Sequence, residues 1–594
     1  MRAKNTATLA GVISGVRFAA KSFEPSLMKR SAIDQGLITG GTFLTGFLAG
    51  ALTGRAITVL PIPAPSSAVT AVGVAAATAR SAELLNSNGT PALPPVDESE
   101  AWSEAGAELL SAVALAGVGS HDKPPITGVA SGTAVVVSTA LETKSALDRR
   151  PDNPDPKYVA TAIGVAAGLN AAVAAIGGVV ALGWKIPKWT MKPGPLRSLT
   201  SVVGIGGAAF GLFAAGNYGI STLLGKIAAG NRKTEIAYSS PPDSNSVSGG
   251  QFSIAGYDTL GVQGRRLVSE VTPVDDIESV MGEKATHEPI RVYVGLGSAE
   301  SEDERIELAI QELRRTGAFD RSLLIVASPA GTGYVNYIAV EAAELMARGD
   351  VATVAVQYGE VPSMLSITKV GDAARVYAKL LDRIRAEIGS TGKKPRIAAY
   401  GESLGAITCQ MGVQQASEGF EGLAVDDALW VGTPQGSALF AELTEAGMPV
   451  FDQFDEVRAY LAEGNEVPDV FFLNHANDPV TKMNPKIFYE SPDWLKSTDR
   501  GRNVEPNQRW LPGVSFWQTL IDTKNAATVI PGEFFSTGHD YRADLAEFIK
   551  AAYHFDDVDD TQMAAIEARL RASEVTRAEA IAEGKVDDAQ ASEV

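Results

Sequence analysis

Long apolar runs with few charges fill the first third of the chain. Residues 158–184 and 199–224 contain no internal charge, and residues 36–60 contain only Arg55. A helix needs about 20 mostly apolar residues to cross a bilayer. Polar residues interrupt two weaker runs, at residues 64–85 and 105–141. An Ala-rich soluble helical domain would have a similar composition, but the two best runs lack a polar face. The pattern therefore predicts an all-α transmembrane helical bundle over residues 1–225.

The hydrophobic pattern changes after residue 289. Short β-like runs alternate there with amphipathic stretches of helical period, notably at residues 301–316, 336–348 and 366–388. Such alternation is typical of a doubly wound, mostly parallel sheet with helices on both faces. The expected strands are residues 290–294, 323–327, 351–357, 396–400, 428–431 and 470–473.

Charge divides the chain at about the same place. Residues 1–225 carry 17 Lys and Arg against 13 Asp and Glu, whereas residues 226–594 carry 34 against 57. The acidic second part argues against nucleic-acid binding. A single cysteine, Cys409, excludes an intrachain disulfide and a Cys-rich metal site, and we expect it to pack on a helix.

The sequence GESLG at residues 401–405 follows one expected strand and precedes a helix-like run. This is the G-x-S-x-G nucleophile elbow of α/β-hydrolases, in which a sharp turn lifts the serine hydroxyl clear of the sheet. The flanking glycines are needed where side chains would clash with neighbouring backbone. The motif predicts Ser403 as a nucleophile.

A serine nucleophile needs a base and an orienting acid, and both follow in the α/β-hydrolase order. Asp478 comes just after the strand at residues 470–473, and His539 lies in a small-residue loop before the last helix. We therefore predict the triad Ser403, Asp478 and His539. His475 is a rival base, and Asp540 a rival acid, although a residue adjacent to the base rarely reaches its ring. His554 is expected to be structural, on the last helix.

Acyl transfer also requires hydrogen-bond donors for the oxyanion. One is expected to be the backbone N–H of Leu404, next to the nucleophile. The others are expected from Ala330 and Gly331 in the loop at residues 328–334, which follows an earlier strand. No G-x-x-x-x-G-K-[ST] pattern occurs, so a nucleotide site is disfavoured. We predict no cofactor and no metal.

The remaining segments complete the domain organisation. We expect residues 226–289 to be a linker and entry to the catalytic domain, residues 290–555 the α/β-hydrolase domain and residues 556–594 an acidic tail, as a frayed helix that ends in disorder. Two inserts interrupt the domain, a helical one at 437–467 and an aromatic-rich one at 484–528. The second predicts a lid over an apolar acyl pocket, or else an ordinary packed subdomain.

Basic residues suggest a topology. The N-terminal 30 residues and the loop at 185–197 are rich in Lys and Arg, which the positive-inside rule places in the cytoplasm. Five spans would then put residues 226–594 on the other side of a cell membrane. Counting residues 105–141 as two spans would reverse this.

Several motifs resemble a bacterial family of membrane-anchored α/β-hydrolases. Residues 25–30, Gln35 and Gly36 resemble its N-terminal membrane domain, and residues 328–333, 401–405, 477–480 and 538–541 resemble its hydrolase half. The resemblance covers the chain up to about residue 555. It implies a multi-span lipase or esterase with Ser403 as nucleophile, Asp478 as acid and His539 as base. The charges Lys29, Arg30 and Asp34 depart from the family pattern near the first span.

The sequence thus predicts a membrane-anchored serine hydrolase that cleaves an ester of a lipid-like or envelope substrate. An aminoacyl-lipid hydrolase and a membrane-bound acyltransferase would use the same triad. A binding or transport protein would be marked by lost triad members, and all three are present.

Overall fold

The chain forms two compact units in the computed structural model, which describes residues 2–59, 98–119, 125–190, 234–360, 366, 369–392, 395–416, 425–526 and 530–586. The first unit contains residues 1–220 together with 483–525. The second contains residues 221–482 and 526–594.

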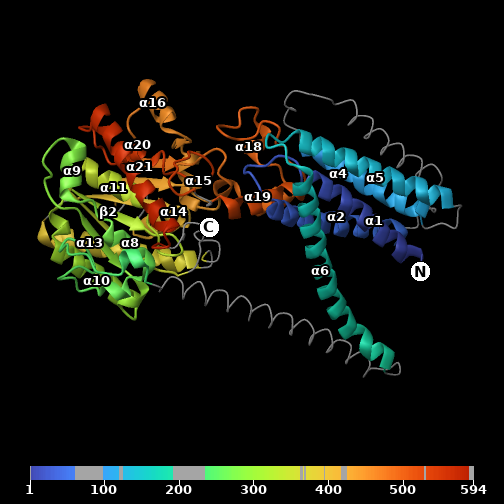
Figure 1. Ribbon diagram of the computed structural model, residues 1–594, viewed down its shortest axis with the longest axis horizontal. Coiled ribbons are helices and arrows are strands. Elements are labelled where there is room, and N and C mark those ends of the chain that lie inside the picture. Colours follow the sequence, from blue (N-terminus) through green and yellow to red (C-terminus); the bar gives the residue numbers. More distant parts are fainter. Residues whose placement is uncertain are drawn as a thin grey trace. The chain divides into compact units, whose positions relative to one another are not determined.

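Helices build the first unit (Figure 1). Glycines allow two of them, α1 and α2, to pack closely. A Cβ on Gly11 would lie 2.8 Å from the Phe47 carbonyl oxygen, and one on Gly50 would lie 2.4 Å from Ser14 Oγ. The small-residue bias of this region therefore serves helix–helix contact. The helices are α1 (Arg2–Lys21), α2 (Ala32–Val59), α4 (Glu98–Gly119), α5 (Pro125–Asp148) and α6 (Pro156–Thr190).

Two of these helices are long and apolar enough to cross a membrane, judged by length and composition alone. The segments are Ala32–Ile57 of α2 and Pro156–Ala175 of α6. The expected run at residues 105–141 is not one helix, because α4 and α5 are separate helices. The expected spans at 64–85 and 199–224 lie outside the described residues. Two candidate helices are a weak basis for a multi-span bundle.

The aromatic insert packs in the first unit, not in the second unit with the sheet, where we expected it. Trp517 stands beside α2, with its indole N–H donating to Thr45 Oγ1 at 3.0 Å. Arg509 forms ion pairs with Glu24 at 3.1 Å and with Glu104 at 3.2 Å. The insert is therefore a packed part of the helical unit. Its elements are η7 (Pro485–Phe488), α18 (Asp493–Lys496) and α19 (Val514–Asn525).

A seven-stranded parallel sheet forms the centre of the second unit, in the order β1-β3-β2-β4-β5-β7-β6. Six strands match the expected runs closely. The seventh, β6, lies within the insert at 437–467 between two short helices. The strands are β1 (Ile290–Val294), β2 (Leu323–Ser328), β3 (Val351–Val356), β4 (Arg396–Glu402), β5 (Asp427–Val431), β6 (Val450–Phe451) and β7 (Val470–Leu473).

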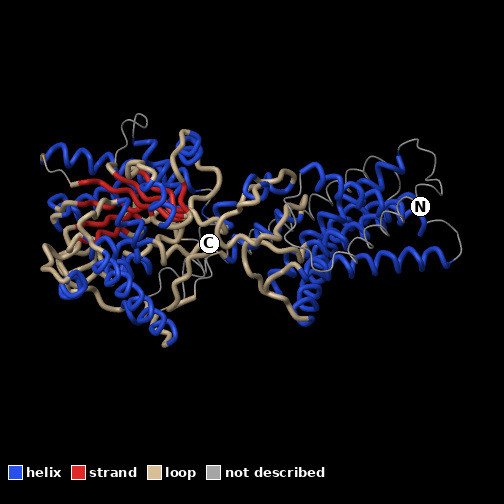
Figure 2. The backbone as a smooth tube through the Cα atoms, turned by 90° about the horizontal axis from the view of Figure 1, so that it is seen from above, coloured by secondary structure: helices blue, strands red, loops and turns tan. Residues whose placement is uncertain are grey.

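Helices cover both faces of this sheet (Figure 2). Ile325 of β2 packs into one hydrophobic cluster while its neighbours Leu324 and Val326 pack into the other. This alternation buries the strands on both faces, as parallel sheets require. The first cluster lies under α8 (Gly261–Ser269), α9 (Val274–Met281), α11 (Tyr337–Met346), α16 (Phe454–Ala462), α20 (Leu545–Ala552) and α21 (Asp560–Ala582), and the second under α10 (Glu302–Thr316), α13 (Val370–Thr391), α14 (Leu404–Ala416) and α15 (Ala438–Glu445).

Two segments that flank residues 290–555 also contribute to the second unit. The linker at 226–289 contributes α8, α9 and the short 3-10 helices η1 (Ile236–Tyr238) and η2 (Tyr257–Thr259), and Val247 bridges to Arg291 of β1. The tail contributes α21, a 23-residue helix that buries Met563, Ile566 and Leu570 in the core. The tail up to residue 586 is thus a structural element of the second unit, not a frayed end.

Candidate active site

Ser403 occupies the turn between β4 and α14 with a left-handed backbone, φ +56°. Few non-glycine residues adopt this conformation, which costs energy unless the surroundings enforce it. Its N–H donates to the Val431 carbonyl oxygen on neighbouring β5 at 2.9 Å. The strain and the strand–turn–helix setting are those of a nucleophile elbow.

Gly405 explains why the motif ends in glycine. A Cβ at this position would lie 2.4 Å from the carbonyl oxygen of Ser328, which ends β2. Ser328 also pairs with Gly401 in the sheet. The loop that follows β2 is therefore held directly beside the elbow, at the carboxyl edge where α/β sheets place their ligands.

Asp478 and His539 are brought together as the sequence predicts. His539 Nδ1 lies 2.7 Å from Asp478 Oδ2, and both side chains are buried. A carboxylate can only accept, so Nδ1 carries the proton and Nε2 is left with a lone pair. The second oxygen, Oδ1, accepts from the N–H of Val480 at 2.8 Å.

The Nε2 atom of His539 is buried and has no hydrogen-bond partner among the described residues. No hydrogen bond joins it to Ser403 in this structure. The backbone of Gly432 lies close against the imidazole ring, since a Cβ at this position would lie only 2.6 Å from His539 Cε1. A base held by Asp478 with an open Nε2 can take a proton from a hydroxyl.

Charge around His539 favours its protonated form. Burial lowers the pKa of His539, but the charge and hydrogen bond of Asp478, with Glu402 and Asp540, raise it above its ordinary value of 6.5. An imidazolium at this position is therefore stabilised by its surroundings.

The predicted oxyanion donors differ in whether their N–H groups already donate a hydrogen bond. The N–H of Leu404 opens α14, and no described residue accepts a hydrogen bond from it. The N–H of Ala330, in contrast, donates to the Tyr334 carbonyl oxygen at 2.8 Å and is used within its own loop. Gly331 lies in the same loop. Leu404 is therefore the better placed donor, and Ala330 is not available in this structure.

The rival residues have other partners. Asp540 binds Arg542 through both carboxylate oxygens, each at 2.9 Å. His475 is buried, with Nδ1 2.9 Å from the Gly538 carbonyl oxygen and Nε2 3.1 Å from Asp544. His554 follows α20 and pairs with Asp427 at 3.2 Å.

The sequence did not predict two further residues of the site, Tyr541 and Glu402. Tyr541 donates to Asp478 Oδ2 at 2.6 Å and stacks on His475. Glu402 accepts hydrogen bonds from Asn336 and Tyr400. Both belong to motifs that the sequence reading used, yet only the tertiary structure shows which side chains they contact.

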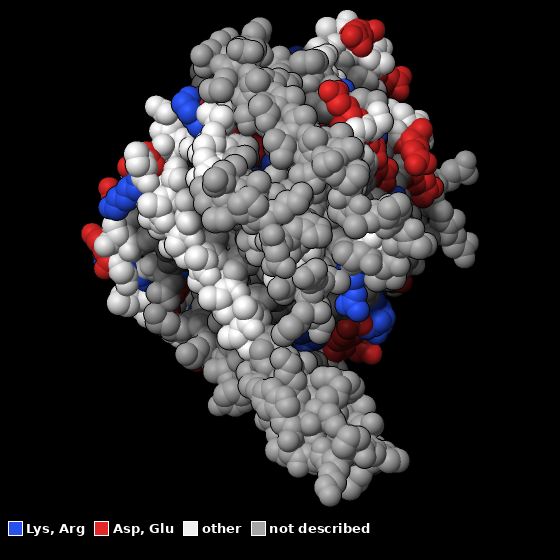
Figure 3. Space-filling view, turned by 90° about the vertical axis from the view of Figure 1, so that its right-hand side faces the viewer, with Lys and Arg blue, Asp and Glu red and all other residues white. Residues whose placement is uncertain are grey.

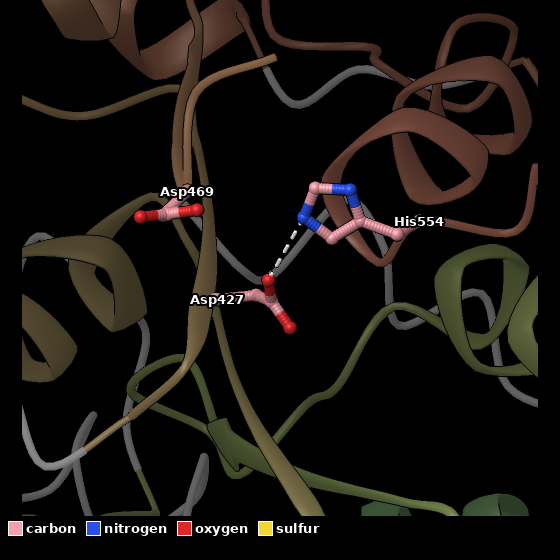
Figure 4. A group of neighbouring side chains, drawn as sticks. All are labelled: Asp427, Asp469 and His554. Carbon is pink, nitrogen blue, oxygen red and sulfur yellow. Dashed lines mark ion pairs between the residues drawn. The ribbon is translucent and has the colours of Figure 1, made fainter. Parts of the chain in front are cut away.

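A second cluster of ionisable side chains lies at the opposite edge of the sheet. Asp427 begins β5, Asp469 precedes β7, and His554 approaches Asp427 (Figure 4). Three such ligands could hold a metal ion, but Arg396 also pairs with Asp427. The guanidinium already supplies a positive charge there, so the cluster is satisfied as an ion-pair group.

Comparison with known proteins agrees with the fold of the second unit. Residues 290–566, a little under half of the chain, match the family model described as an alpha/beta-hydrolase family. Searches of curated proteins and of solved structures find no match. By its parallel sheet and by this match, the C-terminal part of the chain is an alpha/beta-hydrolase domain.

Proposed function

We propose that this protein is a serine ester hydrolase of the lipase or esterase kind, with an acyl-enzyme formed on Ser403. One observation carries the proposal. His539 is fixed by Asp478 through Nδ1 while its buried Nε2 has no partner, in a site that also holds a serine on a strained elbow. This is the arrangement that activates a hydroxyl nucleophile.

The mechanism follows from these groups. His539 Nε2 takes the Ser403 proton as Oγ attacks the ester carbonyl carbon, and the N–H of Leu404 stabilises the resulting oxyanion. The imidazolium then returns the proton to the leaving alkoxide, and the alcohol departs. Water, deprotonated by the same imidazole, attacks the acyl-enzyme and releases the acid. An acyltransferase would differ only in the acceptor that replaces water.

Membrane anchoring is the second part of the proposal. Leu48 and Leu52 of α2 are 59% and 67% exposed, and Ile163 of α6 is 55% exposed. Figure 3 shows a stretch of described surface that carries neither Lys and Arg nor Asp and Glu. Exposed apolar helices of this length fit a bilayer. A multi-pass anchor would hold the enzyme beside a lipid or envelope ester, on the extracytoplasmic side.

Labelling with a fluorophosphonate probe tests the nucleophile. The wild type should form a covalent Ser403 adduct and hydrolyse 4-nitrophenyl esters. Ser403→Ala should lose both, apart from a small residual rate. Ser390→Ala is the matched control, because this exposed serine bonds only to its own helix. Equal hydrolysis by wild type and Ser403→Ala would exclude the proposed triad.

A further inference from the structure

A second carboxylate, that of Glu402, stands one residue before the nucleophile. Glu402 ends β4 and is partly exposed. Its Oε2 accepts from Asn336 Nδ2 and from the Tyr400 hydroxyl, each at 2.9 Å. Both donors are neutral, so they orient the carboxylate without balancing its charge.

Glu402 differs in this respect from the other acids of the site. Asp478 has His539 as its partner, and Asp540 has Arg542. Among the described residues, no cation forms an ion pair with Glu402, and its Oε1 accepts no hydrogen bond. A bound substrate would withdraw this partly exposed carboxylate from water, which is costly without a cationic partner. The Glu402 carboxylate is thus a negative charge of the site that a cation could neutralise.

The place of Glu402 makes that partner a substrate group. Asn336, which holds it, caps α11 at the end of the loop beside the elbow. Burial raises the pKa of Glu402 above its ordinary value, and the charge of His539 opposes this rise, so the two groups share one electrostatic environment. Glu402 also directly precedes Ser403 at the elbow, so we infer that its carboxylate borders the space where an ester bound to Ser403 would lie.

We propose that Glu402 selects ester substrates that carry a positively charged ammonium group close to the scissile bond. This inference rests on the proposed ester hydrolysis. A purely apolar substrate would bury Glu402 unpaired, an anionic one would be repelled, and an ammonium group would supply the missing partner. The cation could belong to the acyl part, as an amino group, or to the alcohol part.

Two pairs of nearly isosteric esters distinguish these sources. For the acyl part, 4-nitrophenyl alaninate is compared with 4-nitrophenyl 2-methylpropanoate. For the alcohol part, butyrylcholine is compared with 3,3-dimethylbutyl butyrate. We expect the wild type to favour the charged member of one pair by about tenfold or more in kcat/KM, the scale of one charged contact.

The variant Glu402→Gln keeps acceptor geometry for Tyr400 and removes the charge. The charged-to-neutral ratio should fall about tenfold, whereas Glu463→Gln, at an exposed position, should leave it unchanged. An equal loss for both members would mean that Glu402 only supports the His539 imidazolium, and would overturn the inference. The inference would also be overturned if the wild type showed no preference for the charged ester in either pair, and this comparison needs no variant. Hydrolysis that survives Ser403→Ala would instead reject the proposed function itself.

Discussion

Tyr541 donates its phenolic hydrogen bond to the same Asp478 oxygen that His539 contacts, at 2.6 Å against 2.7 Å. The tyrosine oxygen also accepts from the N–H of His475 at 3.1 Å. One hydroxyl thus fixes both Asp478, the acid of the proposed triad, and the strand end that carries it.

Tyr541→Phe should consequently weaken both stability and catalysis. It leaves the buried His475 N–H without an acceptor and removes one donor from Asp478, at a cost of about 1–3 kcal/mol. We expect a drop in kcat of up to about tenfold, since Asp478 keeps its contact with His539. Unfolding and kinetic measurements check this, with Tyr489→Phe, at an exposed position, as control. Unchanged behaviour of Tyr541→Phe would contradict it.

The identity of the acid gives a second prediction. Asp478→Asn should lower kcat steeply, by up to about 10⁴-fold, because the imidazole loses the charge that sets its tautomer. Asp540→Asn should cost far less in catalysis, since Asp540 is paired with Arg542 and makes no hydrogen bond to His539. Steady-state kinetics on one ester decide the ranking. The opposite order would transfer the role of acid to Asp540.

The pH dependence of kcat/KM gives a third prediction. Catalysis needs neutral His539, and its pKa lies above 6.5 because the raising charges of Asp478, Glu402 and Asp540 outweigh burial. The value of kcat/KM should therefore rise with pH through an inflection above 6.5. Glu402→Gln removes one raising charge, so its inflection should move to lower pH. A wild-type inflection below 6.5 would contradict this assignment.

Much of the hydrolase half was predictable because local patterns specify it. Buried parallel strands such as β1 and β2 are continuous apolar runs, and Ser301 and Gly317 mark the ends of α10 as a capping box and a left-handed cap. The strand β6 was not predicted, because a strand of two residues is too short to show an alternation of apolar and polar positions. The spacing of Met563, Ile566 and Leu570 indicates a helix face, but the acidic composition around it hid the signal.

Other features depend on contacts that no local pattern encodes. The insert at 484–528 is aromatic in sequence, yet only packing shows that Trp517 and Arg509 belong with the N-terminal helices. The use of the Ala330 N–H within its own loop is likewise a tertiary detail. The order Ser403, Asp478 and His539 follows the α/β-hydrolase pattern, and the 2.7 Å contact between His539 and Asp478 agrees with it.

The last helix supplies a fourth prediction. Glu574 of α21 is buried and accepts from Arg542 at 2.6 Å and from the N–H of Gly532 at 3.1 Å. Arg542 follows His539 by three residues, so α21 steadies the loop that carries the base. Breaking such a buried pair costs about 3–5 kcal/mol.

Glu574→Gln should accordingly lower the free energy of unfolding of the hydrolase unit by a few kcal/mol, on the order of a buried ion pair. Glu579→Gln, on the exposed side of the same helix, should change it little. Chemical unfolding of both variants provides the measurement. Equal effects of the two changes would mean that α21 does not support the His539 loop.

The side of the membrane is the fifth prediction. The basic N-terminus and the basic segment 185–197 are both assigned to the cytoplasm, which puts the hydrolase half outside when an odd number of spans precedes it. Residues 105–141 decide the count. Five spans require that residues 105–141 cross once, which α5 alone would do if the ion pairs of Glu104 and Glu108 with Lys21 keep α4 packed within the helical unit.

Protease added to intact spheroplasts should therefore remove a C-terminal tag while a cytoplasmic marker survives. Cleavage of the tag supports an extracytoplasmic catalytic half beside an envelope substrate. Full protection until lysis would place the catalytic half inside and make α4 and α5 a membrane hairpin. The carboxylates of α4 would then lie in the bilayer, where they would need Lys21 as their partner.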